Sequence, residues 1–159
     1  DSGRILSGRY FDLVYSIGNS IVHQPDRITV ARLAETIHAL LADGGTFIAQ
    51  IVNFDRILNY SLDSLPAIER PEHGVRLIRH YGIADDSRTV SFDTVLEAGN
   101  DRYENSVRLL ALTVSELEDI LVSAGFGSVK LYGAYDGSPF NVDSPALVIE
   151  AAKNPGNGA

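Results

Sequence analysis

The sequence contains no cysteine, no methionine and no tryptophan. Without cysteine the chain cannot form a disulfide bond, a thiolate metal site or a cysteine nucleophile. Without methionine at position 1 the sequence does not begin at an unprocessed start codon, which leaves open a processed product or a partial sequence. The absent residues therefore remove several kinds of chemistry but do not indicate a cellular compartment.

Positive charge and long apolar runs are also scarce. The 13 basic residues are outnumbered by 21 acidic ones, the formal net charge is -8, and no Lys/Arg cluster stands out against it. We therefore expect no nucleic-acid partner. No apolar run approaches the roughly 20 residues that span a bilayer, and no signal-peptide pattern begins the chain, so we expect a cytoplasmic protein without a membrane partner.

Histidine occurs without the spacing of a metal site. The four histidines are His23, His38, His73 and His80. Zinc sites usually place histidines a few residues apart or combine them with cysteines, and neither pattern occurs. The sequence thus predicts no bound metal.

What is present is enough apolar material for one core. With 159 residues and 45% hydrophobic residues, the chain fits a single domain, which we place at residues 1–153 with a flexible tail at 154–159. Residues 11–17 and 46–52 are short apolar runs typical of buried strands. Between them, apolar residues recur at helical spacing from Asp26, and Gly44-Gly45 is expected to end that helix. A strand, a helix and a strand in this order predict a parallel βαβ unit.

The second half of the chain begins with a different pattern. Residues 75–81, 89–97 and 103–112 read as strands joined by short turns, so we expect a small antiparallel insertion at about 74–112. Thr113 and Glu116 then form a capping box that opens a helix, and strands are expected at 128–132 and 146–151. The fold class is therefore α/β: half of a doubly wound sheet with an antiparallel β insertion.

Two turns mark the expected site. Gly18-Asn19-Ser20 and Asn53-Phe54-Asp55 follow the two parallel strands, at the sheet edge where ligands bind in α/β folds. The segment Phe11-Asp-Leu-Val-Tyr-Ser-Ile-Gly-Asn-Ser-Ile-Val-His23 resembles the fourth strand and following loop of glycine N-methyltransferase-like enzymes, a group of class I S-adenosylmethionine-dependent methyltransferases. Residues 41–45 and 53–58 match the same group at the expected separation.

The resemblance implies the C-terminal half of a Rossmann-like methyltransferase sheet, and an enzyme that transfers a methyl group from S-adenosyl-L-methionine to a small-molecule acceptor, an amine. Aligned to the family pattern, the chain starts just after the third strand. The glycine-rich turn and the acidic residue that hold the cofactor would then lie outside it. No Gly-x-Gly-x-x-Gly follows any expected strand.

The resemblance also assigns roles to individual residues. Cofactor contacts are implied for Asp1, Ser2, Ile17, Gly18 and His23, the first two near the adenine and His23 near the amino-acid part. Asn19 and Asn53 are implied as the catalytic residues, because such enzymes present side-chain amides to the acceptor there. An amide oxygen can accept a hydrogen bond from a neutral amine and orient its lone pair. Val52 stands where glycine-specific members have an arginine that pairs with the substrate carboxylate, so glycine is not the expected acceptor.

Simpler interpretations stay open beside these roles. Asn19 fits a turn residue in the left-handed conformation, His23 fits a surface residue, and Asn53 with Asp55 fits caps of the next segment. The insertion also carries arginines that fit either surface pairs with glutamates such as Glu97 and Glu104 or a lid over the substrate: Arg76, Arg79, Arg88, Arg102 and Arg108.

Two further questions concern the whole molecule. The chain fits a non-catalytic binding module derived from a methyltransferase as well as an enzyme, and a different α/β nucleotide-dependent enzyme is the other alternative. The first strand should also expose one edge, which we expect to be covered by a second copy in a homo-oligomer or by an additional N-terminal segment.

Overall fold

The computed structural model describes residues 10–156, and its first layer is a mixed four-stranded sheet. The strands lie in the order β1 (Phe11–Ser16), β2 (Leu41–Val52), β8 (Ala146–Ala152) and β7 (Ser128–Tyr132). β1 runs parallel to β2, whereas β8 is antiparallel to both β2 and β7. The predicted parallel pair and the two late strands are therefore confirmed.

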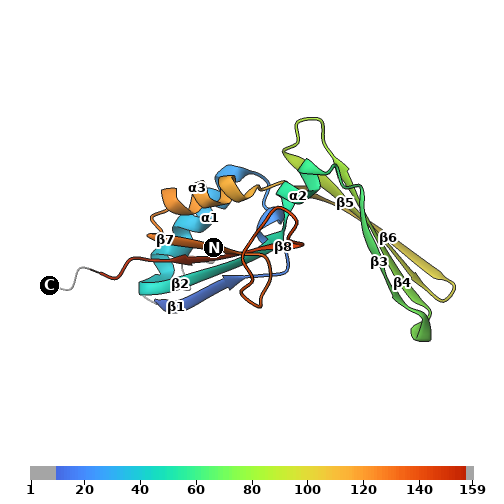
Figure 1. Cartoon of the computed structure of the whole chain (residues 1–159), viewed down its shortest axis with the longest axis horizontal. Coiled ribbons are helices and arrows are strands. Elements are labelled where there is room, and N and C mark those ends of the chain that lie inside the picture. The colour runs from blue at the N-terminus through green and yellow to red at the C-terminus, as the bar shows by residue number, and fades with distance from the viewer. Residues whose placement is uncertain (1–9, 157–159) are drawn as a thin grey trace.

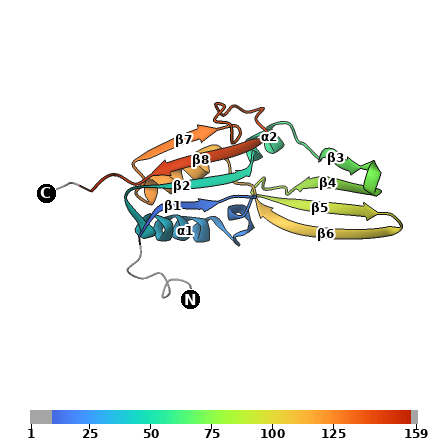
Figure 2. The same ribbon diagram turned by 90° about the horizontal axis from the view of Figure 1, so that it is seen from below.

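Helices cover one face of this sheet. α1 (Arg27–Leu40) and α3 (Val114–Ser123) lie side by side on the same side of the strands (Figures 1 and 2). The core between helices and sheet contains the following buried apolar residues: Val30, Ala34, Ile37, Phe47, Ala49, Leu117, Leu121 and Ile149. No helix among residues 10–156 covers the opposite face, and none is long and apolar enough to cross a membrane.

Different interactions determine where α1 begins and where it ends. Asp26 caps the first turn, since its carboxylate accepts a hydrogen bond from the Thr29 amide at 2.7 Å. The expected stop at Gly44-Gly45 is wrong, because the helix ends at Leu40 and the chain enters β2 at once. Gly44 instead lies in β2 with a φ of 75°, beside a shift in the β1–β2 register. Leu41 is fully buried, and anchors this transition in the core.

A second, antiparallel sheet projects beyond the end of the first (Figure 2). It consists of β3 (Ser64–Arg70), β4 (Val75–Ile83), β5 (Thr89–Ala98) and β6 (Asp101–Leu110), paired in chain order. The sequence predicted the last three strands but missed β3, so the second sheet begins at Ser64 rather than near residue 74.

Short helices connect these parts. η2 (Ile21–His23) follows β1, α2 (Phe54–Asn59) follows β2, and η3 (Pro71–His73) joins β3 to β4. Of the tail expected at residues 154–159, the last three residues lie outside the described part.

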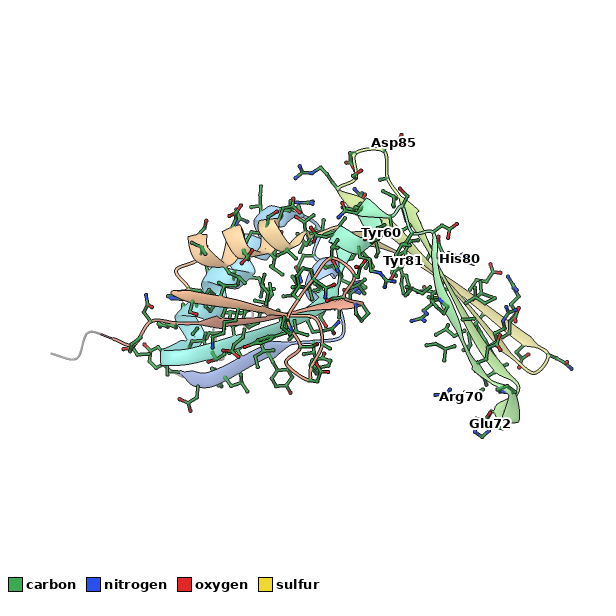
Figure 3. The ribbon with its side chains drawn as sticks, viewed as in Figure 1. Tyr60, Arg70, Glu72, His80, Tyr81 and Asp85 are labelled. Atoms are coloured by element: carbon green, nitrogen blue, oxygen red, sulfur yellow. The ribbon has the colours of Figure 1, made fainter. Side chains whose placement is uncertain are left out.

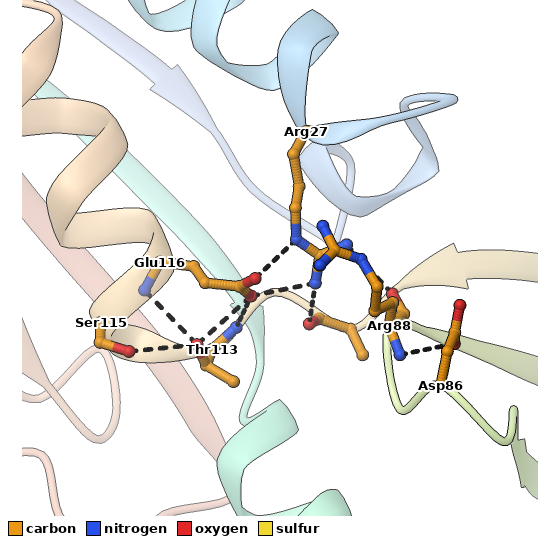
Figure 4. A network of polar contacts seen from close by, with 7 residues as sticks. Arg27, Asp86, Arg88, Thr113, Ser115 and Glu116 are labelled. Atoms are coloured by element: carbon orange, nitrogen blue, oxygen red, sulfur yellow. Dashed lines mark hydrogen bonds and ion pairs between the residues drawn. The ribbon is translucent and has the colours of Figure 1, made fainter.

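A polar network holds α1, α3 and the base of the second sheet together (Figure 4). The predicted capping box is confirmed: the Glu116 amide donates to Thr113 Oγ1 at 3.4 Å, and the Thr113 amide donates to Glu116 Oε2 at 3.1 Å. Arg27 donates to both oxygens of the Glu116 carboxylate and to the Ala111 carbonyl at 3.0 Å. Because Ala111 directly follows β6, this network fixes where the second sheet leaves the first.

Candidate functional site

The two predicted turns meet at the carboxyl ends of β1 and β2. The backbone amide of Asn19 donates to the Gln50 backbone carbonyl at 3.2 Å, and the backbone amide of Gly18 donates to Gln50 Oε1 at 2.8 Å. In the other direction, the Val52 amide donates to Asn19 Oδ1 at 2.9 Å. Asn19 has a φ of 66°, so its interpretation as a left-handed turn residue is confirmed.

These bonds limit what Asn19 can offer a ligand. Its Oδ1 already accepts the Val52 amide, which leaves one lone pair on that oxygen. Its Nδ2 has no hydrogen-bond partner among residues 10–156, and the residue is half-buried. Asn19 can therefore both brace the turn and contact a small molecule, and its catalytic role stays a prediction.

The side chain of Asn53 makes more structural hydrogen bonds than that of Asn19. The side chain is 1% exposed, its Nδ2 donates to the carbonyls of Val142 at 3.0 Å and Ser144 at 2.8 Å, and its Oδ1 accepts the Arg56 amide at 3.2 Å. The capping interpretation is thus confirmed, since Oδ1 caps α2. Both hydrogens of the side-chain amide are used, so Asn53 could bind the methyl-accepting substrate only through the remaining lone pair of Oδ1.

The neighbours of Asn53 differ from their expected roles. Asp55 does not cap α2; its carboxylate accepts the Val114 amide at 2.8 Å, and so joins α2 to the first turn of α3. Phe54, in the middle of the turn expected to mark the site, is 1% exposed and belongs to the core. Asn53, Phe54 and Asp55 therefore mainly connect α2 to the core, to α3 and to the loop before β8.

The predicted cofactor residues are only partly within the described chain. Asp1 and Ser2 lie outside residues 10–156. Ile17 is 46% exposed, and Gly18 has a φ of 70° with open space where a side chain would begin. His23 is exposed at the end of η2, as its surface interpretation predicted. Ile17 and Gly18 thus leave room for a ligand beside the turn, while the cofactor contacts themselves stay predictions.

A cavity of about 480 Å³ opens beside Asn53, at the junction of the two sheets. Its wall combines the end of β2, α2, β3, β4 and the loop before β8, with these lining residues: Val52, Asn53, Arg56, Ile57, Leu62, Ser64, Leu65, Pro66, Arg79 and Pro145. No sequence motif marked Arg56, and Arg79 appeared only as one of the arginines of the insertion. No local pattern could identify either as a cavity residue, because the wall forms from segments far apart in the chain.

Two tyrosines flank this junction (Figure 3). The Tyr60 hydroxyl donates to Asp143 Oδ1 at 2.9 Å, and this hydrogen bond together with the carboxylate charge raises the pKa of Tyr60. Burial raises the pKa of Tyr81. Both phenols therefore remain protonated at neutral pH and act as neutral groups.

Three arginines of the second sheet have two different environments. Arg76 and Arg102 pair with glutamates on the exposed surface, with Arg102 3.0 Å from Glu97 and 2.8 Å from Glu104, as the surface interpretation predicted. Arg79 instead faces the cavity and donates from Nη2 to the Pro66 carbonyl at 2.8 Å.

Among residues 10–156 no group of three or more His, Asp or Glu side chains could hold a metal ion.

No protein-family model and no curated protein matches the chain in sequence. Solved structures do match. An S-adenosylmethionine-dependent methyltransferase from Clostridium acetobutylicum is 14% identical with a TM-score of 0.74, over 97% of this chain and 63% of that one. The CcbJ methyltransferase from Streptomyces caelestis is 17% identical with a TM-score of 0.76, over 92% of this chain and 62% of that one.

This chain has a methyltransferase fold. The sugar N-methyltransferase KedS8 from a Streptoalloteichus species matches as well, at 16% identity and a TM-score of 0.60, over 93% of this chain and 58% of that one. At such identities the match concerns the fold alone. The chain spans about 60% of the length of these methyltransferases. None of the three is described as a glycine N-methyltransferase, so the predicted subgroup stays a prediction.

Proposed function

We propose that the protein is an S-adenosylmethionine-dependent methyltransferase acting on a small-molecule amine, with this chain forming the acceptor side of the site. The observation that carries the proposal is the meeting of the Asn19 turn with the end of β2, next to the cavity beside Asn53. In α/β folds this edge of the sheet is where ligands bind.

The residues present fit only one side of the cofactor. Ile17 offers an exposed apolar surface and Gly18 offers space, but the chain contains no glycine-rich turn after a strand. When bound, the cofactor supplies a methyl group on a positively charged sulfur. The chain's own contribution is to orient the acceptor: Asn19 Oδ1, held by the Val52 amide, has one lone pair to accept a hydrogen bond from the amine.

A non-catalytic binding module is the second candidate. It is favoured by the structural hydrogen bonds of the Asn53 side chain, which use both hydrogens of Nδ2 and one lone pair of Oδ1, since a residue predicted to be catalytic then has little left to offer a substrate. The two candidates differ in one property: only the enzyme transfers a methyl group.

The test is transfer of tritiated methyl from S-adenosylmethionine to a panel of small amines by the protein from the complete reading frame that contains this chain. We expect methylated product, with kcat/KM lowered roughly tenfold or more in Asn19→Ala. Asn19→Asp keeps an oxygen for the Val52 amide and should retain more activity. Asn105→Ala, on the exposed side of β6, is the control. Wild-type kcat/KM in Asn19→Ala would eliminate the role of Asn19, and absence of any product would favour the binding module.

A further inference from the structure

The wall of the cavity beside Asn53 carries positive charge without a compensating acid. Its lining includes two guanidinium groups, Arg56 on α2 and Arg79 on β4, and no aspartate or glutamate. The rest of the lining is mostly apolar, which lowers the local dielectric and strengthens any charge interaction inside. The cavity is therefore an electropositive pocket in a chain whose formal net charge is -8.

Arg79 is held in place but incompletely satisfied. Its Nη2 donates to the Pro66 carbonyl at 2.8 Å, which fixes the guanidinium against β3. Its Nε is buried and has no hydrogen-bond partner among the described residues. Buried donors are nearly always paired, so an unpaired one at a cavity wall needs an acceptor from the cavity, which water or a bound oxyanion can supply.

Arg56 is equally available. Neither Arg56 nor Arg79 belongs to any ion pair within residues 10–156, where the paired cations are Arg27, Arg76, Arg102, Lys130 and Lys153. Acidic residues outnumber basic ones in this chain, so partners for two more arginines are abundant elsewhere on the surface. The two cations that line the cavity are left without one.

We infer that this cavity binds an acceptor that carries an oxyanion, a carboxylate or a phosphate, which Arg56 and Arg79 hold together. Planar guanidinium groups bind such oxyanions through paired, charge-assisted hydrogen bonds. The inference rests on the proposed function in one respect, that the ligand is the methyl acceptor. The neighbouring Val52 and Asn53 place the bound molecule next to the Asn19 turn, so its amine can approach the turn while its oxyanion stays with the arginines.

The test is a titration of the 159-residue chain, followed through the arginine Nε–Hε resonances in ¹⁵N–¹H spectra. Inorganic phosphate and propionate are added separately, with chloride keeping the ionic strength constant. The Arg79 resonance is assigned by its loss in Arg79→Gln, or in Arg79→Lys if the first variant does not fold. We expect a saturable shift of this resonance, and saturation by one probe at lower concentration identifies phosphate or carboxylate as the preferred group.

Variants decide whether the two arginines act together. Arg56→Gln should weaken the apparent affinity at Arg79 by about tenfold or more. Arg108→Gln removes the same charge from an exposed position on β6 and should leave the affinity unchanged. A shift that rises linearly without saturation, or an affinity unaffected by Arg56→Gln in the folded protein, would overturn the inference. Because no cofactor is added, a failure here is distinguishable from a failure of methyl transfer.

Discussion

Arg27 and Glu116 form a two-pronged ion pair between residues that are distant in the sequence. Arg27 Nε lies 2.6 Å from Glu116 Oε1, and Nη2 lies 3.0 Å from Oε2. The side chains are only 19% and 33% exposed, so solvent screens the pair less than a surface pair. Since Arg27 starts α1 and Glu116 lies in the first turn of α3, the pair fixes both helices over the sheet.

Removing the charge of Glu116 should destabilise the fold. We expect Glu116→Gln to lower the free energy of unfolding by about 1–3 kcal/mol, because a paired, partly buried arginine loses its counter-ion. Urea denaturation followed by circular dichroism measures this. The control is Glu104→Gln, which breaks the exposed pair with Arg102 and should cost less than about 1 kcal/mol. Equal losses in the two variants would contradict the structural role of the Arg27–Glu116 pair.

The same pair predicts a pH dependence. Burial raises the pKa of Glu116, but hydrogen bonds from Arg27 and Thr113 outweigh it and lower the pKa below its ordinary value of 4.5. A carboxyl group with a lowered folded-state pKa stabilises the fold above its unfolded-state pKa, and this contribution is lost as the pH falls through the folded-state pKa. The difference in unfolding free energy between wild type and Glu116→Gln should therefore shrink below about pH 4.5. A difference that stays constant down to acid unfolding would refute this assignment.

Two variants of Asn19 separate the contribution of its side-chain hydrogen bond to stability from that of its left-handed backbone conformation. Asn19→Gly removes the hydrogen bond to the Val52 amide but accepts the φ of 66°, and should cost about 1 kcal/mol. Asn19→Ala loses the same bond and keeps a β-carbon in the left-handed region without the polar side chain that lets asparagine adopt it, which adds about 1 kcal/mol relative to glycine. Thermal or urea unfolding of the two variants gives the comparison. If alanine were no worse than glycine, the left-handed turn would not be required by the fold.

Asn53 should matter for stability whether or not it contacts a substrate. In Asn53→Ala the carbonyls of Val142 and Ser144 lose their donor and α2 loses its cap, so we expect a loss of about 2–4 kcal/mol. Asn105→Ala, at an exposed position on β6, should change the stability by less than about 0.5 kcal/mol. A loss in Asn53→Ala as small as in the control would show that its hydrogen bonds are not formed in solution.

The open edge of β1 predicts self-association of this chain. β1 pairs only with β2 among the described residues, and Leu13 and Tyr15 on it are 51% and 66% exposed. Unpaired edges with apolar side chains favour strand pairing between molecules. Sedimentation velocity should show association that rises with concentration and falls in Leu13→Lys. Val122→Lys, at an exposed apolar position on α3, should not have this effect. A monomer at all concentrations would rule out an exposed adhesive edge.

Local patterns explain which elements the sequence could predict. β1, β2, β7 and β8 appear as short apolar runs, and the start of α3 appears as a capping box, because each depends on neighbours in the chain. β3 was missed because nearly all its residues are exposed and Pro66 interrupts it; it is a strand because it pairs with β4. The end of α1 was misplaced because Leu41 is drawn into the core before Gly44 is reached.

In the candidate site, too, local sequence predicted some features, and contacts between distant segments determine the others. The Asn19 and Asn53 turns could be located from the sequence, because they follow the two parallel strands. Their hydrogen bonds to Gln50, Val52 and the loop before β8 could not, since they join segments far apart in the chain. The same limit applies to Arg79, which the sequence placed on a strand but which becomes a cavity residue only when β3 and α2 are folded beside it.

We propose that this chain forms part of an enzyme that uses S-adenosylmethionine. Calorimetric titration of S-adenosylhomocysteine, the demethylated cofactor, into the protein from the complete reading frame tests it most directly. We expect one site per protein molecule with micromolar affinity. A folded protein that gives no binding heat at any temperature tested, and no protection against thermal unfolding by the same ligand, would contradict it.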